Sequence, residues 1–163
     1  HVPLQGFEGQ GAGGDLQGIP GRRPRAAQLA VGAPGQGLGQ IDEGVQLLRV
    51  GLGALMLAGH GWGKLVGFGE MAQKFPDPLG VTPPVSLALA VFGEVVCSSL
   101  VVVGVYTRLA AIPALVTMAV AAFLVHAGDP WADKEMAVLY GLGFLVLIIA
   151  GGGRFALDRL WHR

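Results

Sequence analysis

Glu94 is the residue most strongly marked for chemistry, because it is an isolated carboxylate inside a long apolar run. The run Pro84–Gly104 has 21 residues, and Glu94 is the eleventh of them. A carboxylate in the middle of a bilayer costs at least about 2.5 kcal/mol, so we expect Glu94 to face other helices and to be paired or protonated there. A protonated Glu94 would pass on a proton, and an ionised one would hold a cationic partner. The alternative is an interhelical hydrogen bond that only fixes packing.

His60 and Lys64 form a second candidate group. They are four residues apart and therefore share one face of a helix. Arg49 precedes His60 by 11 residues, which at about 100° per residue points it to within about 20° of the same direction. This basic stripe predicts an inward-facing side with a shared polar site. In the alternative, Lys64 extends to the lipid head groups and His60 is an interfacial residue with no task.

His126 and Glu135 lie on either side of a short loop between two apolar runs. With four membrane spans, this loop falls on the same side as His60 and Lys64. We therefore predict an outer-leaflet polar pocket of these four residues, with Glu94 about halfway down. Such a pocket is typical of a quinone head-group site or a proton path, because histidine titrates near neutral pH and both donates and accepts hydrogen bonds.

The sequence offers few motifs for a resident cofactor. Its one cysteine, Cys97, excludes an internal disulfide, a CxxC pair and a cysteine zinc site, and we expect it to pack as a small side chain. No metal site is predicted, because the histidines lack a ligand spacing such as HExxH. No motif for haem, flavin or iron–sulfur is present either. Any prosthetic group is therefore expected on a partner protein, and this chain is expected to have no covalently bound group and to bind a quinone at the polar pocket.

Other polar and small residues are expected to have structural roles. Arg154 and Asp158 are four residues apart and predict a cytoplasmic cap with an (i, i+4) ion pair. Arg49 and Arg108 are assigned to structural polar contacts in the same way. Small-xxx-small spacing predicts close helix approach at Gly59, Gly63 and Gly67.

The composition indicates that these residues are held by membrane helices. Of the 163 residues, 52% are hydrophobic and 13% are charged. A soluble domain has about 25% charged residues, so this chain lacks the polar surface for water. The net charge is +0, which excludes a nucleic-acid binder because phosphate contacts need a clustered basic surface.

Four runs between charged residues predict an all-α, polytopic four-helix bundle. A bilayer core about 30 Å thick needs roughly 20 helical residues, and each run has about that length. The expected transmembrane helices are Val45–Leu65, Pro84–Tyr106, Leu109–Ala127 and Ala132–Ala150. The runs lack the alternation of a barrel strand.

Residues 1–44 have a different composition, with 12 Gly and 4 Pro. Such a segment cannot bury enough apolar surface to offset the cost of ordering its backbone, so we predict a disordered tail before the membrane domain 45–163. Because position 1 is His1, we expect a fragment or an upstream-extended reading frame, in which the tail is extraneous.

The basic residues predict the orientation. Three lysines fall on one side of the predicted membrane, namely Lys64, Lys74 and Lys134. Eight arginines fall on the other side, namely Arg22, Arg23, Arg25, Arg49, Arg108, Arg154, Arg159 and Arg163. Because basic residues gather in the cytoplasm, both termini are expected there.

Several short motifs together resemble the DoxX family of small bacterial membrane proteins. They are Leu48-Arg49, His60-Gly61-Trp62-Gly63-Lys64, Gly93-Glu94, Gly104-Val105-Tyr106-Thr107-Arg108-Leu109-Ala110, His126, Glu135 and the closing 151–158. The resemblance covers about Val45–Trp161, and the tail has no counterpart in it. It implies an inner-membrane protein associated with respiratory or thiol redox chemistry, since members are described as subunits of a thiosulfate:quinone oxidoreductase or as anchors for redox partners.

The leading hypothesis is a membrane subunit that supports electron transfer between a partner oxidoreductase and the quinone pool, without activity alone. His60 and His126 would bind the quinone carbonyls, Lys64 would stabilise reduced oxygen, and Glu94 would move the proton. One alternative is a non-catalytic scaffold that recruits soluble redox or thiol-stress enzymes. The other is a small-solute or proton permease. The sequence leaves open whether the chain forms a homo-oligomer.

Overall fold

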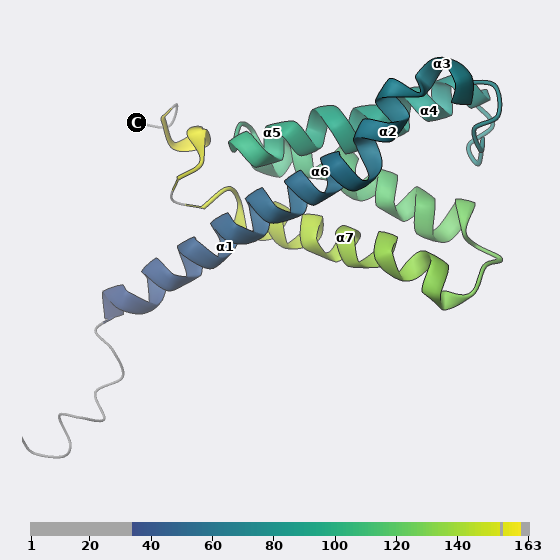
Figure 1. Ribbon diagram of the computed structural model, residues 1–163. Helices are drawn as coiled ribbons and strands as arrows, with labels where there is room; N and C mark the ends of the chain where they lie inside the picture. The colour runs from purple at the N-terminus through teal and green to yellow at the C-terminus, as the bar shows by residue number, and fades with distance from the viewer. Residues whose placement is uncertain (1–33, 154, 161–163) are drawn as a thin grey trace, which may run out of the picture.

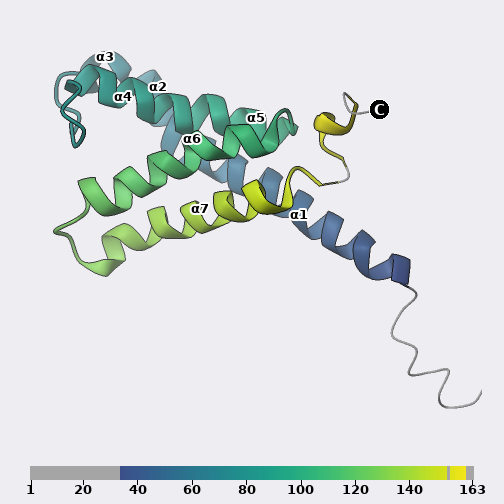
Figure 2. The same cartoon turned by 180° about the vertical axis from the view of Figure 1, so that it is seen from behind.

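The computed structural model describes residues 34–153 and 155–160, and this part of the chain is helical with no strand. The predicted disorder of 1–33 and the predicted role of Arg154 lie outside the described residues. The all-α fold class is confirmed. The described residues form four long helical rods, which Figures 1 and 2 show from opposite sides.

The first rod runs continuously over residues 34–66. It consists of α1 (Pro34–Met56), a π-helical segment η2 (Leu57–Gly61) and α2 (Trp62–Val66). The expected start at Val45 was wrong, and residues 34–44 of the predicted tail are helical. The helix extends upstream because Pro34 suits a first helical turn and the backbone near Asp42 meets Gly153 of the distant C-terminal segment. In Figure 1 this end of α1 projects beyond the other rods.

The remaining rods match the predicted ranges to within a few residues. After the short α3 (Phe68–Met71), the second rod is α4 (Pro83–Val91), π-helical η3 (Phe92–Cys97) and α5 (Ser98–Val103). The third is α6 (Thr107–Val120) with π-helical η4 (Ala121–Val125). The fourth is α7 (Trp131–Ala150), which a 3₁₀ turn, η5 (Leu157–Leu160), follows. In the described part of the chain, Pro83–Val103 and Thr107–Val125 are long and apolar enough to cross a membrane.

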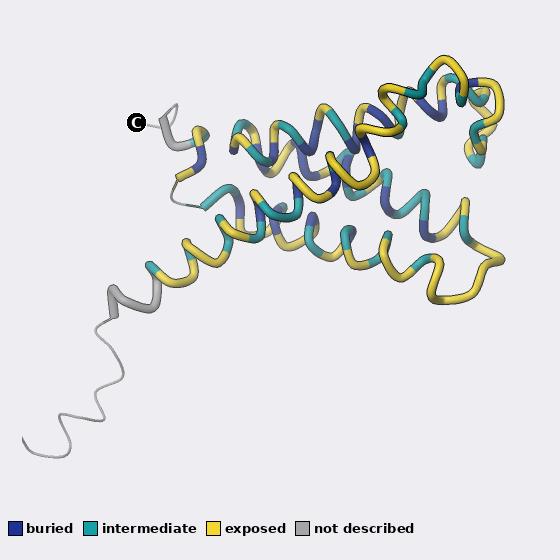
Figure 3. The backbone as a smooth tube through the Cα atoms, in the orientation of Figure 1, coloured by how far each residue is buried: buried dark blue, intermediate teal, exposed yellow. Residues whose placement is uncertain are grey.

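The rods meet around one apolar core. Phe144 and Leu147 of α7 are fully buried, as is Met56 at the end of α1. Across from them α6 presents small side chains, Ala110, Ala111 and Ala114, which let the helices approach closely. Cys97 belongs to the same core and is 2% exposed, as expected for a packing residue. Figure 3 shows the buried positions along the faces where the rods meet.

The closest approaches between helices do not occur at the predicted glycines. A Cβ atom at Gly59 or Gly63 would meet nothing within 4 Å. At Gly61, by contrast, it would lie 2.8 Å from the carbonyl oxygen of Glu94, and at Gly53 it would lie 3.0 Å from that of Ser98. The first and second rods therefore touch backbone to backbone at Gly53 and Gly61. The spacing identified the right helix, but the π-helical turn at 57–61 changes which glycine faces the neighbour.

Charged side chains cap the helix ends at the end of the bundle where α5 meets α6, which we call the cap end. Buried Arg49 donates from Nη1 to the carbonyls of Val101 and Val102, both at 2.9 Å, in the last turn of α5. Arg108 donates to the carbonyl of Ile149, at 3.2 Å, in the last turn of α7. A cation at each C-terminal end satisfies orphan carbonyls and suits the helix dipole.

Asp158 completes the cap end by closing the start of α6. Its carboxylate accepts hydrogen bonds from the backbone N–H groups of Tyr106 and Thr107, the latter at 3.0 Å. The predicted partner Arg154 lies outside the described residues, so that ion pair stays a prediction. The (i, i+4) spacing did not reveal that Asp158 caps a helix about 50 residues earlier in the chain, since |i−j| is 51 for the Thr107 bond.

Two alanine substitutions in the first rod, at Gly61 and at Gly59, test the backbone contact between the first and second rods. Gly61→Ala is expected to lower the free energy of unfolding by about 1–3 kcal/mol, because the added methyl group meets backbone that cannot move aside. Gly59→Ala is the matched control and should leave stability unchanged or raise it by up to about 1 kcal/mol, since its methyl enters open space. Unfolding in mixed detergent micelles, followed by circular dichroism, measures both. Equal effects of the two substitutions would contradict the close approach at Gly61.

Candidate functional site

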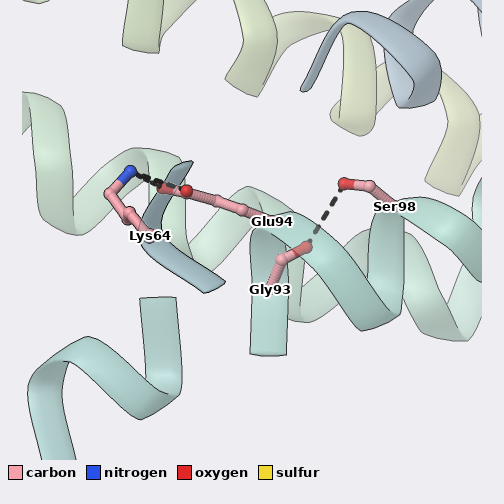
Figure 4. A network of polar contacts seen from close by, with 4 residues as sticks. All are labelled: Lys64, Gly93, Glu94 and Ser98. Carbon is pink, nitrogen blue, oxygen red and sulfur yellow. Dashed lines mark hydrogen bonds and ion pairs between the residues drawn. The ribbon is translucent and has the colours of Figure 1, made fainter. Parts of the chain in front are cut away.

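Glu94 is paired with Lys64 across the first and second rods. The ammonium nitrogen lies 2.8 Å from Oε1 and 2.6 Å from Oε2, so both carboxylate oxygens accept from Lys64 (Figure 4). The side chain of Glu94 is 6% exposed and that of Lys64 is 25% exposed. The expectation that Glu94 faces other helices and finds a partner is therefore met, and the partner is a cation. The lysine points to the bundle and does not simply extend to the head groups.

Both residues of this pair lie in or beside irregular helix. Glu94 is within η3, and Lys64 follows η2 by one turn. At the end of η3 the hydroxyl of Ser98, the first residue of α5, donates to the carbonyl of Gly93 at 3.3 Å (Figure 4). π-helical turns in α-helices are frequent at functional sites because they re-aim a side chain without ending the helix.

His60 does not join Lys64 at Glu94. Its ring packs edge-on against Tyr140 of α7, with ring centroids 5.3 Å apart and an interplanar angle of 82°, and the residue is exposed. The predicted common face assumed 100° per residue, whereas His60 lies within the wider turn of η2. Lys64 therefore turns toward the second rod and His60 toward the fourth.

A groove of about 630 Å³ runs between the second and third rods, and Glu94 lines it. Its walls are mainly apolar, with Leu89 and Phe92 on one side and Val116 and Val120 on the other. His126 lies at the end of η4 and lines the same groove. The groove therefore places one carboxylate and one imidazole on an apolar surface. Sequence reasoning missed this groove, because it depends on how two rods diverge.

His126 is oriented by a local contact. Its Nδ1 lies 2.8 Å from Oδ2 of Asp129, three residues later in the loop. This contact occupies one ring nitrogen and leaves Nε2 for another partner. Glu135, by contrast, is exposed on α7, and its side chain makes no hydrogen bond or ion pair within the described ranges. It does not line the groove.

A turn before α4 covers the end of the groove near His126. Phe75 and Leu79 from this turn line the groove. Asp77 holds the turn in place, because its carboxylate accepts from the hydroxyl of Ser86 at 2.7 Å and from the backbone N–H of Thr82 at 2.8 Å. These bonds, that of Ser86 first, lower the pKa of Asp77 below its ordinary value of 3.8. No sequence motif pointed to this arrangement.

The structure therefore divides the predicted polar pocket into separate groups. Glu94 contacts Lys64 and shares the groove with His126, whereas His60 and Glu135 lie elsewhere. Arg49 is far from this site and caps α5. Across the residues that the structure describes, no group of three His, Cys, Asp or Glu side chains could hold a metal ion.

Removing either member of the ion pair tests its energetic role. Lys64→Met should lower the free energy of unfolding by about 3–5 kcal/mol, because it leaves a buried carboxylate unpaired. Glu94→Gln should cost less, since the more exposed Lys64 can turn to water. The double variant should be more stable than Lys64→Met alone. Unfolding in mixed micelles measures all three, with exposed Lys74→Met as control, and a double variant as unstable as the sum of the singles would contradict the pairing.

The turn at Asp77 should give stability that depends on pH. Because the folded-state pKa is lowered, the contribution of Asp77 is fully present above 3.8 and is lost as the pH falls through the lower folded-state value. Asp77→Asn should therefore be less stable than the wild type at neutral pH, and the difference should disappear in acid. Thermal unfolding over a pH series measures this, with exposed Asp133→Asn as control. A difference that stays constant into acid would contradict it.

The comparisons with known proteins agree with this architecture. The model of the DoxX family matches residues 44–127, which is more than half of the chain. The inner membrane protein YqjF of Escherichia coli is 29% identical over 126 residues, which are 75% of this chain and 95% of that protein. No solved structure matches the chain.

Two uncharacterized proteins of Haemophilus influenzae are also similar. One is 29% identical over 98 residues, which are 57% of this chain and 65% of its own length. The other is 38% identical over 77 residues, 43% of this chain and 58% of its own length. The chain thus spans a little under two thirds of these two relatives. From the family match we conclude that the chain belongs to the DoxX family.

Proposed function

We propose that the protein spans the bacterial inner membrane four times and holds a quinone in the groove between the second and third rods, in support of a partner oxidoreductase. The observation that carries the proposal is the apolar groove of about 630 Å³ with Glu94 and His126 on its wall. Pockets for small molecules measure about 300–1,000 Å³ and combine apolar walls with a few polar groups. A quinone has a flat ring with two carbonyl oxygens and a long apolar tail, which matches this lining.

The four crossings and their direction rest on charge and length. Two rods are apolar enough to span, and the first and fourth pack along them over the same core. The relative YqjF is named an inner membrane protein. In the described part of the chain, Arg49 and Arg108 lie at the cap end, and Lys74 and Lys134 lie beside the loops at the other end, which favours a cytoplasmic cap end with the termini on that side.

The groove lies on the outer surface of the bundle, so its ligand would come from the lipid. Leu89 is 49% exposed and Phe92 is 47% exposed on one wall, and Val116 is 55% exposed on the other. In a membrane these side chains contact acyl chains. A quinone diffusing in the bilayer would enter sideways, with its tail along the apolar walls and its ring toward Glu94 and His126.

Within the groove, Glu94 and His126 are the groups that can exchange protons with a quinone. Reduction to the quinol takes two electrons and two protons. The electrons would come from the partner enzyme, since the sequence has no motif for a redox group of its own. Because Nδ1 of His126 donates to Asp129, its Nε2 would donate a hydrogen bond to a quinone carbonyl as the imidazolium, and the carboxylate of Glu94 would accept one from a quinol hydroxyl. His126 thus keeps the carbonyl-binding role expected of both histidines, His60 has no part in it, and Lys64 acts behind Glu94.

Binding of a ubiquinone analogue to the purified protein in lipid nanodiscs tests the proposal. Glu94→Gln and His126→Ala should each weaken binding at least about tenfold, which corresponds to a lost hydrogen bond of about 1.4 kcal/mol. His60→Ala is the matched control, because the ring packs on Tyr140 outside the groove. Loss of binding in the His60 variant, with binding intact in the other two, would contradict the assignment.

The same purified protein also separates the quinone proposal from the two alternatives, a scaffold and a permease. A scaffold would retain its soluble redox partner but bind no quinone, and a permease would show flux in liposomes without any partner. Either result would overturn the quinone proposal.

A further inference from the structure

A second cavity lies at the cap end, apart from the groove. Its volume is about 420 Å³. It is formed where the turn between α5 and α6 meets the end of α7 and the side of α1. The charged residues described in its lining are Asp42, Arg108 and Asp158. The glycine run 151–153 also lines it. The quinone proposal uses none of these residues.

Of the three charged residues that the structure describes in this lining, two are available to a ligand. The carboxylate of Asp158 is already engaged by the N–H groups of Tyr106 and Thr107. Arg108 is exposed and makes one hydrogen bond, from Nη2 to the carbonyl of Ile149, so most of its donors are unused. Asp42 is half-buried and has no hydrogen-bond or ion-pair partner in the described part of the chain.

Arg108 and Asp42 line the same cavity without pairing with each other. A cation and an anion that face a common space and do not touch fit a ligand that carries both charges. A simple anion would satisfy Arg108 but be repelled by Asp42, and a simple cation would have the reverse problem.

The glycine run keeps this space open. Gly151 has φ of 83° and Gly153 has φ of 75°, conformations that side chains rarely adopt. A Cβ atom at Gly151 would lie 3.0 Å from Nε of Arg108 and would crowd the guanidinium. The run therefore ends α7 and also leaves Arg108 room to reach a ligand.

Four crossings of the membrane, as proposed above, would place the cavity beside the lipid-facing surface at the level of the head groups. Leu109, on its rim, is 64% exposed, and Ala150 beside it is also exposed. It lies at the ends of three rods, where a bilayer changes from hydrocarbon to polar groups.

From these observations we propose that the cavity binds the head group of an ethanolamine phospholipid, with the phosphate on Arg108 and the ammonium on Asp42. A guanidinium holds phosphate through charge-assisted hydrogen bonds, and a primary ammonium donates up to three to a carboxylate and to nearby carbonyls. A choline head group has no N–H to donate, and an uncharged glycerol head group brings no cation. The site therefore distinguishes lipids by the group beyond the phosphate.

Native mass spectrometry of the full chain, with an equimolar mixture of ethanolamine, choline and glycerol phospholipids of the same acyl chains, tests this site. The wild type should retain the ethanolamine lipid about tenfold more than either other lipid. Asp42→Asn should abolish that preference while leaving the fold intact, since the contact of Asp42 with Gly153 is made by its backbone and the substitution changes only the side chain. Glu43→Gln, the exposed neighbour, should keep it. Arg108→Gln should reduce retention of all three.

Three results would overturn the proposal. Equal retention of the three lipids by the wild type would show an unselective surface, and an unchanged preference in Asp42→Asn would show that this carboxylate does not read the ammonium. Release of the lipid by soluble phosphoethanolamine at equal concentration would identify a soluble ligand instead. The place of the site at the head groups rests on the four crossings proposed above, whereas the readout involves no quinone, so failure of the lipid site and failure of the quinone site are distinguishable.

Discussion

The ion pair of Lys64 and Glu94 governs how the first two rods can pack. Glu94 lies at the eleventh position of its apolar run and is almost fully buried, so hydrocarbon or protein surrounds it on every side. A charge in such a place needs an opposite charge in contact with it. Lys64 can supply that charge only because Gly61 lets its helix touch the backbone at Glu94. The electrostatic contact and the backbone contact therefore depend on each other.

The two ends of the bundle are held by different means. At the cap end, Arg49, Arg108 and Asp158 bind helix termini that are distant in the sequence. At the other end, Asp77 and Asp129 make contacts within a few residues of their own positions. Long-range contacts fix the relative position of whole rods, whereas local contacts shape single loops. The groove opens toward the locally held end, where the neighbouring structure can adjust most easily.

Much of the fold could be predicted from the sequence, because charge is costly in lipid. The gaps between charged residues gave the last three rods to within a few residues. The start of α1 was missed because a glycine-rich segment looks like a linker until its contact with Gly153 is known. The predictions for the candidate site were only partly correct, for a different reason. Glu94 was identified by its isolation, but its partner and its groove depend on angles between helices that spacing alone cannot give.

Local departures from α-helical geometry explain most of these differences. Spacing rules place residues by a constant angle, and a π-helical turn has more residues and so a smaller angle per residue, which is why the prediction for His60, within η2, failed.

The three π-helical segments also bear on how the chain tolerates change in length. A π-helical turn accommodates one more residue than an α-helical turn of the same span, so it resembles a single-residue insertion that the helix has absorbed. Deleting one residue within Phe92–Cys97 would therefore restore regular α-helical geometry and leave the two halves of the second rod facing nearly the same directions as before. Relatives that align with this rod through a one-residue gap would present the same faces on both sides of the gap, and would differ mainly at the turn that carries Glu94.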